Sequence, residues 1–309
     1  MAGARTKAVF SGMALGKEEA MGGLPKVIAT VNFKGGVGKT TATWLLARVA
    51  SEEDPVLVID ADAQMSLTTA VELSEETGRF PEDFERWFRA HQEARRTLFD
   101  AIDQFTRGGG YFDFPIDGRV AFRVHERLWL IPATSDLYWL TLEVFDRDQM
   151  QGFAHALVLK FARAGAGFRY VFFDCPPSFT VLSYSILTNC DLILVPVNPD
   201  VFADRGLNIL LEGLELQLQP HPFPKVAVFM NRARLYRGGF TRETRYYWEQ
   251  VGAICRKWLE KGIPIRPLRT FLPERADVRK SIPKGGRVPE DLRQELRKLW
   301  QEIREFLGG

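Results

Sequence analysis

The chain has 309 residues, a length that suits one large α/β domain or two small ones, and 46% of them are apolar, which is ample for a core. It contains no run of about 18 or more apolar residues and no uninterrupted apolar stretch near the N-terminus, so it predicts neither a transmembrane helix nor a secretory signal. Because Cys175, Cys190 and Cys255 lack any metal-binding spacing, we expect buried thiols in a reducing cytoplasm.

Along the chain, short apolar runs alternate with segments of helix length. Residues 1–24 are rich in Gly and Ala and predict a flexible extension, and residues 25–309 predict a single domain. The apolar runs show no polar alternation, which is typical of strands buried on both faces of a parallel sheet. The predicted fold class is therefore α/β, a doubly wound, mostly parallel sheet flanked by helices. The predicted strands are residues 27–32, 56–60, 128–131, 170–174, 191–196 and 225–230.

The most informative stretch is the glycine-rich loop from Lys34 to Thr40, which lies between an apolar run and a helix-like segment. Strand, glycine turn and helix together bind nucleotide phosphates, because the glycines turn backbone N–H groups inward and the helix adds the positive end of its dipole. Lys39 is expected to reach the β- and γ-phosphates, and the Thr40 hydroxyl to bind Mg²⁺. The residues expected to contact the nucleotide here are Gly35, Gly36, Val37, Gly38, Lys39, Thr40 and Thr41.

Carboxylates follow two further predicted strands. Asp60 and Asp62 come at the end of the apolar run 56–60, and functional residues of a parallel sheet gather at the carboxyl ends of its strands. Asp174 ends the run 170–174, which is the Walker B form, and its carboxylate is expected to bind Mg²⁺.

The loop departs from the strict P-loop pattern, because Phe33 stands where that pattern has glycine and a second lysine, Lys34, opens the loop. Together with Asp-Ala-Asp-Ala-Gln at 60–64 and Asp-Cys-Pro-Pro at 174–177, this loop resembles the deviant Walker A ATPases of the ParA/MinD superfamily, and the chain is most similar to the ParA/Soj branch. The family has proline where this chain has Ala63.

The resemblance implies roles for single residues. Lys34 is expected to act in catalysis by reaching the nucleotide of a second subunit, alongside Lys39 in cis. Asp62 orients the attacking water, Asp60 helps to hold the Mg²⁺ shell with Thr40 and Asp174, and Asn231 contacts adenine. ATP then joins two subunits, and hydrolysis, slow until a partner stimulates it, releases them.

The remaining expectations concern partners. Residues 225–309 carry 20 Lys and Arg against 10 Asp and Glu, a net charge of +10, which favours a polyanion-binding face. We therefore expect an ATP-dependent homodimer that binds DNA without sequence preference and positions or segregates a cargo with a ParB-like adaptor, in the cytoplasm and on the nucleoid. One arginine cluster comprises Arg232, Arg234, Arg237, Arg242 and Arg245. A second begins with Arg266 and Arg269 and contains the residues predicted to bind DNA, Arg275, Arg279, Lys280, Lys284 and Arg287.

Two alternatives remain open. A MinD-type membrane-associated ATPase is suggested by an apolar stripe in the segment Asp291–Leu307, although residues 290–309 have a net charge of −1, which favours packing on the sheet. An iron–sulfur reductase would use Cys175 and Cys190, neither of which stands in a cluster-binding spacing.

The segment 78–97 is a predicted helical insertion. Phe84, Trp87 and Phe88 lie on one face of its helix, and we expect that face to cover a sheet edge rather than to dock a partner.

Overall fold

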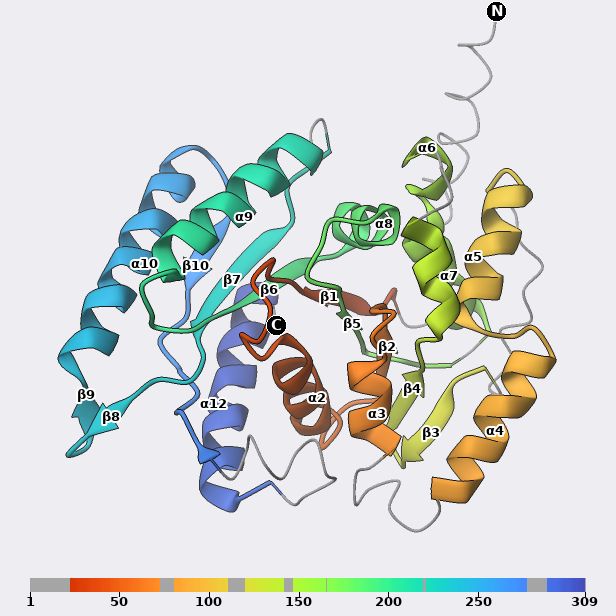
Figure 1. Ribbon diagram of the computed structural model, residues 1–309, viewed down its shortest axis with the longest axis horizontal. Coiled ribbons are helices and arrows are strands. Elements are labelled where there is room, and N and C mark those ends of the chain that lie inside the picture. Colours follow the sequence, from red (N-terminus) through yellow and green to blue (C-terminus); the bar gives the residue numbers. More distant parts are fainter. Residues whose placement is uncertain are drawn as a thin grey trace, which may run out of the picture.

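The computed structural model describes residues 23–72, 81–110, 120–141, 147–164, 166–218, 221–276 and 288–308. Its centre is an eight-stranded sheet in the order β10-β7-β6-β1-β5-β2-β4-β3 (Figure 1). Neighbouring strands are parallel except β3, which pairs antiparallel with β4 at one edge. The predicted fold class is confirmed. Most of the predicted N-terminal extension lies outside the described residues, and its flexibility stays a prediction.

All six predicted strands are present within two residues of the expected ends. Two edge strands were not predicted, β3 and β10, because they are only four and three residues long and carry too few apolar side chains to produce a signal. The strands of the large sheet are β1 Lys26–Thr30, β2 Val56–Asp60, β3 Phe122–His125, β4 Leu128–Ile131, β5 Tyr170–Asp174, β6 Leu192–Val197, β7 Lys225–Met230 and β10 Ile265–Pro267.

Helices cover both faces of the sheet, so the side chains of one strand alternate between two cores. In β1, Val27 and Ala29 belong to one core and Ile28 to the other, and none of the three is more than 6% exposed. This double burial explains the apolar, non-alternating strand sequences. One face packs against α2 Lys39–Ala50, α3 Ser66–Glu72, α4 Pro81–Glu93 and α12 Glu290–Leu307. The other packs against α5 Leu98–Arg107, α7 Phe153–Arg163, α8 Val181–Asn189, α9 Ala203–Leu218 and α10 Arg242–Glu260. The turns η2 Ser135–Thr141 and α6 Arg147–Met150 connect β4 to α7.

Helix α4 lies inside the segment predicted as an insertion, and its aromatic face packs inward. Phe84 is only 2% exposed, and its ring lies edge-on to Phe122 of the edge strand β3, with 5.0 Å between ring centroids. Trp87 lies against the same ring at 5.2 Å. The expectation that this helix covers a sheet edge is confirmed.

Helix α12 packs its apolar stripe against α2 and the sheet. Leu292, Leu296, Leu299 and Ile303 are all at most 2% exposed, and Phe306 packs partly buried against the same core. The face that a membrane-binding helix would insert into lipid is therefore buried inside the fold.

Candidate nucleotide and magnesium site

The sheet register brings the predicted carboxylates together at the carboxyl ends of the strands. Thr30 at the end of β1 and Asp60 at the end of β2 are both aligned with Asp174 at the end of β5. The loop after β1 and the first turn of α2 lie at the same edge. A cavity of about 540 Å³ opens there, lined by the glycine-rich loop, Asp62, Gln64 and Arg232.

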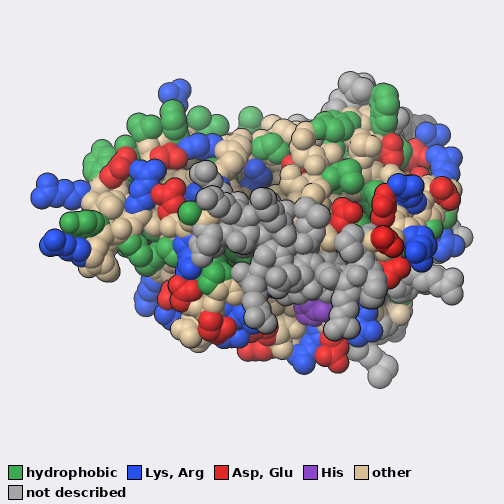
Figure 2. Space-filling model, turned by 60° about the horizontal axis from the view of Figure 1, so that its bottom comes forward, with side chains coloured by type: hydrophobic (Ala, Val, Ile, Leu, Met, Phe, Trp, Pro, Cys, Tyr) green, Lys and Arg blue, Asp and Glu red, His purple; other side chains and the backbone are tan. Residues whose placement is uncertain are grey.

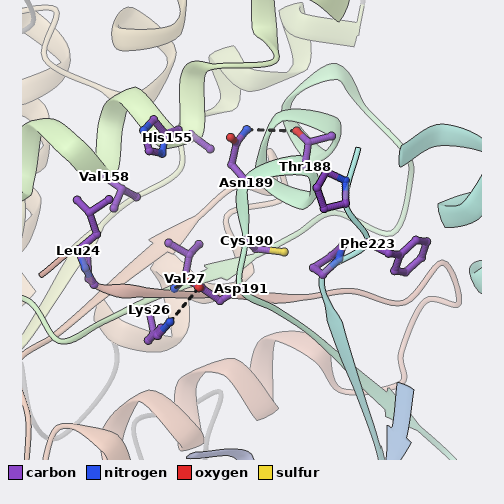
Figure 3. Close-up of a pocket in the computed structure, with 14 residues that line it drawn as sticks. Leu24, Lys26, Val27, His155, Val158, Thr188, Asn189, Cys190, Asp191 and Phe223 are labelled. Carbon is purple, nitrogen blue, oxygen red and sulfur yellow. Dashed lines mark hydrogen bonds and ion pairs between the residues drawn. The ribbon is translucent and has the colours of Figure 1, made fainter. Parts of the chain in front are cut away.

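A second cavity of about 540 Å³ lies at the opposite edge, where β1 and β6 begin (Figure 3). It is lined by His155, Cys190 and the ion pair of Lys26 with Asp191, in which Nζ and Oδ1 are 3.2 Å apart. None of the predicted site residues lines it. Functional residues of a parallel sheet collect at the carboxyl ends of its strands, so we assign the site to the first cavity.

The loop conformation requires glycine at two positions. Gly36 and Gly38 have φ values of 74° and 87°, in the left-handed region that favours glycine. At Gly38 a Cβ would also lie 2.5 Å from the Asn231 side-chain amide, which donates a hydrogen bond of 2.7 Å to the Val37 carbonyl. Asn231 therefore fastens the loop to the end of β7.

Phe33 explains why the strict pattern fails at the start of the loop. Its ring lies edge-on to Phe179, 6.1 Å between centroids, and contacts α9 so closely that a Cβ on Gly213 would lie 3.3 Å away. The residue thus anchors the entrance of the loop to the neighbouring helix. Lys34 follows it directly, as the first residue of the loop.

Lys39 is the buried cation of the site. Only 8% of it is exposed, and burial lowers its pKa, while the nearby Asp174 and Asp62 carboxylates act in the opposite direction. A desolvated ammonium group beside carboxylates is stabilised further by a polyphosphate, because each negative charge offsets the cost of burial.

Asp174 has the properties expected of a magnesium-site carboxylate. It is 1% exposed, and burial, followed by the charge of Asp60, raises its pKa, while a hydrogen bond from the Thr40 side chain lowers it. Thr43 of α2 donates to its Oδ1 at 3.2 Å, whereas its Oδ2 is buried without a hydrogen-bond partner. A buried, unpartnered carboxylate oxygen beside a threonine hydroxyl fits a hydrated Mg²⁺ ion.

Asp60 is more fully engaged than the sequence suggests. Its Oδ2 accepts hydrogen bonds of 2.8 Å from both the backbone N–H and the hydroxyl of Thr68, and its Oδ1 accepts the Asp62 N–H at 3.1 Å. Burial raises its pKa, and the bonds from Thr68 oppose that change. In this structure Asp60 organises the loop that carries Asp62, and its place in the metal shell stays a prediction.

Asp62 faces the cavity beside Gln64. The Gln64 N–H donates to Asp62 Oδ1 at 3.0 Å, and the Gln64 side-chain amide donates to the Tyr138 hydroxyl. Replacement of the family's proline by Ala63 therefore leaves the loop held by hydrogen bonds. The water-orienting role of Asp62 remains a prediction that its position permits.

Lys34 is held within its own chain. Its Nζ lies 2.6 Å from Asp200 Oδ2 in the loop after β6, and 5.0 Å from the centroid of the Phe202 ring. Both charged side chains keep more than a third of their surface exposed, at 36% and 38%. The lysine thus lies at the mouth of the site without reaching its own phosphate cavity, whose lining begins at Gly35.

A smaller cavity of about 190 Å³ adjoins the loop and is lined by Asn231, Arg232 and Leu272 among others. It places Asn231 where a base would lie if the phosphates occupy the glycine loop. One of its amide hydrogens is already donated to Val37, so adenine recognition by Asn231 stays a prediction. Arg232 of the first arginine cluster lines both cavities.

The residues predicted to bind DNA are largely outside the described residues. Arg279, Lys280, Lys284 and Arg287 fall there, and Arg275 forms an ion pair with Asp291 of α12. Sequence reasoning also missed Thr43, Thr68 and Asp200, because a lone Thr or Asp outside a motif gives no signal.

Within the described ranges there is no group of three His, Cys, Asp or Glu side chains that could hold a metal, and the three cysteines are free. Among the described helices none is long and apolar enough to cross a membrane.

Comparison with known proteins identifies the family. A family model described as an AAA domain matches residues 25–221, which is more than half of the chain. The chain belongs to this family, in its ParA/MinD type. The chromosome partitioning protein ParA of Caulobacter vibrioides is 30% identical over 191 residues, covering 62% of each protein, so the match spans less than two thirds of that relative.

Two solved structures show the same fold. Apo McdA of Cyanothece superposes with a TM-score of 0.66 at 20% identity, covering 92% of this chain and 99% of that one. The pNOB8 ParA bound to nonspecific DNA gives a TM-score of 0.61 at 21% identity, covering 92% and 97%. At these identities the structural likeness establishes the fold alone.

Proposed function

We propose that the protein is a magnesium-dependent ATPase that dimerises around ATP, binds DNA without sequence preference and positions or segregates a large cargo with an adaptor protein. The observation that carries the proposal is the convergence of Lys39, Asp62 and Asp174 on one glycine-rich loop, with Lys34 at its mouth. The proposal is supported by the similarity to ParA of Caulobacter vibrioides, named for chromosome partitioning.

In this proposal the chain's own residues do most of the chemistry by position and charge. The loop amides and Lys39 offset the charge of the phosphates, and Asp62 holds the attacking water in line with the γ-phosphate. Mg²⁺, held through Thr40 and Asp174, would supply charge neutralisation between the β- and γ-phosphates.

Lys34 couples hydrolysis to dimerisation. The Lys34 ammonium group lies at the surface, where it binds Asp200 and does not enter the cavity of its own chain. In a dimer whose two sites face each other, this ammonium group would lie next to the nucleotide of the second copy. An approaching lysine stabilises charge that develops on the phosphates during transfer. Hydrolysis then removes the bridging charge and releases the two copies.

DNA binding is supported by the basic C-terminal third and by the likeness to a ParA that was solved on nonspecific DNA. A nucleoid-associated location follows if this binding occurs in the cell. An adaptor of the ParB kind would stimulate the slow basal turnover.

A titration of duplex DNA binding against salt, with ATP, with ADP and without nucleotide, tests the proposal. We expect binding only with ATP, falling steeply as the salt concentration rises. Equal binding in all three nucleotide states would contradict the dimer switch, as would a monomeric molar mass by light scattering in the presence of ATP.

A further inference from the structure

A two-stranded hairpin projects from the carboxyl edge of the sheet just beyond the nucleotide site. It consists of β8 Leu235–Tyr236 and β9 Gly239–Phe240, and its turn uses Arg237 and Gly238 with φ values of 48° and 79°. It begins three residues after Arg232, which lines the nucleotide cavity. In Figure 1 the hairpin lies at the outer edge of the molecule, at the start of α10.

The base of the hairpin is firmly attached to the body. The Phe240 ring lies edge-on to Phe271 with 4.7 Å between centroids, and the Thr241 N–H donates to the Arg234 carbonyl at 3.1 Å. The Arg234 guanidinium is neutralised by Glu274, with Nε and Oε2 3.0 Å apart, and lies 3.6 Å from Glu243. The hairpin is therefore a rigid projection, and Arg234 serves its attachment.

The outer side of this projection is basic and aromatic. Residues 232–246 contain five arginines and one acid, a net charge of +4. Tyr236 is 67% exposed and Tyr246 is 57% exposed, and Arg237 lies over the Tyr236 ring. Lys and Arg side chains project with hydrophobic ones at this edge of the molecule in Figure 2. We call Leu235, Tyr236, Arg237, Arg242, Arg245 and Tyr246 the hairpin surface.

Three cations of the hairpin surface have no acidic partner in the part of the chain that the structure describes. These are Arg237 at the turn and Arg242 and Arg245 on the first turns of α10. By contrast, Arg234 and Arg275 are engaged by Glu274 and Asp291. Arginine without a local counter-charge is suited to a partner that brings closely spaced negative charges, and a phosphate backbone does so.

We propose that the hairpin surface docks on duplex DNA, with Arg237, Arg242 and Arg245 on backbone phosphates. The inference rests on the proposed function, since it names the DNA-contacting element of the same protein. A two-stranded ribbon is narrow enough to enter the major groove, and tyrosine hydroxyls add donors to phosphate oxygens. The guanidinium groups contact the backbone, so the surface distinguishes DNA from other partners by charge and carries no sequence preference.

The hairpin is close in the chain to residues of the nucleotide site, so its contact with DNA can be coupled to nucleotide binding. Asn231 binds the Val37 carbonyl of the glycine loop, and Arg232 lines the phosphate cavity. Only Ala233 and Arg234 separate these residues from β8. A change in the loop on nucleotide binding therefore acts within three residues of the DNA-contacting element.

The test compares two triple variants of the full chain by fluorescence anisotropy on a labelled duplex of arbitrary sequence, with ATP and Mg²⁺. Arg237→Ala/Arg242→Ala/Arg245→Ala removes the three cations of the hairpin surface. Arg256→Ala/Lys257→Ala/Lys261→Ala removes the same charge at the far end of α10. Thermal unfolding of both variants checks that each is folded, and Arg237→Ala alone serves if the first triple variant is unstable.

We expect the hairpin variant to bind at least about tenfold more weakly and the slope of log affinity against log salt to fall by about one for each lost phosphate contact. The control variant should retain most of the affinity, and replacement of the three arginines by lysine should retain the salt slope, since the charge remains.

Three results are distinguishable. If the unaltered chain fails to bind DNA with ATP, the proposed function itself is wrong. If it binds but the two triple variants weaken equally, or only the control weakens, the hairpin assignment is overturned while the proposed function stands. If a single strand of the same length binds more tightly and Tyr236→Ala/Tyr246→Ala abolishes that preference, the duplex assignment is overturned.

Discussion

The contact between Lys34 and Asp200 predicts that neutralising the aspartate strengthens ATP-dependent dimerisation. The lysine must leave Asp200 before it can reach a second nucleotide, so the ion pair opposes assembly. Since both side chains are more than a third exposed, the pair is worth about 0.2–1 kcal/mol. A dimer releases two such pairs, about 0.4–2 kcal/mol in total, which corresponds to a roughly 2- to 30-fold lower dimer dissociation constant in Asp200→Asn.

Sedimentation velocity with a non-hydrolysable ATP analogue and Mg²⁺ measures this constant. Asp204→Asn, in the first turn of α9, is the matched control, because it removes the same charge four residues along the chain from Asp200 and leaves the Lys34 ion pair in place. The gain should shrink as salt rises, since partly exposed ion pairs are screened. The argument that the Lys34–Asp200 ion pair opposes dimerisation is refuted if Asp200→Asn dimerises no better than the Asp204 control, or less well than the unaltered chain.

Three further substitutions test the site. Lys34→Ala should leave the affinity for a fluorescent ATP analogue intact while abolishing hydrolysis, and an equal loss of both would argue against action on a second subunit. Gly38→Ala, where φ is 87° and a Cβ has no room, should lose nucleotide binding in the same titration, whereas Gly35→Ala, which faces open space, should keep most of it. Thr68→Val removes the hydroxyl that donates to a buried carboxylate and accepts the Ala133 N–H, so urea unfolding should show a loss of about 1–3 kcal/mol. The exposed Thr69→Val should stay within about 0.5 kcal/mol of the unaltered chain.

The interior strands were predictable because burial on both faces forces a continuous apolar sequence. This held for 56–60 and 170–174, whose every residue is buried. The edge strands β3 and β10 gave no such signal, since an edge position buries less surface and tolerates polar side chains such as Arg123 and Arg266.

The site was predictable where a motif fixes the spacing along the chain. Lys34, Lys39 and Asp174 were found in this way, whereas Thr68 and Asp200 act through contacts that only the folded sheet creates. Thr68 lies eight residues from Asp60 and Asp200 lies 166 residues from Lys34. No local pattern encodes a pair at that separation.

Which of the basic residues are paired with acids was the feature hardest to predict from the sequence. Net charge identifies the C-terminal third as basic, but it does not distinguish an arginine neutralised by its own chain from one left unpaired. Arg234 and Arg237 are three residues apart, and within the described ranges the first pairs with two glutamates whereas the second lies over a tyrosine ring and has no acidic partner.

The packing of α12 on α2 makes the last helix part of the foundation on which the phosphate loop rests. Leu296 and Leu299 share one core with Leu45 and Leu46 of the helix that begins at Lys39, and Lys225 at the start of β7 donates to the closing carbonyls of Phe306 and Leu307. Shortening or destabilising this helix would therefore weaken triphosphate binding at the N-terminal end of α2, and Leu292 of α12 also lines the small cavity beside the loop. A fusion tag used to image this protein should therefore leave the packing of α12 on α2 intact.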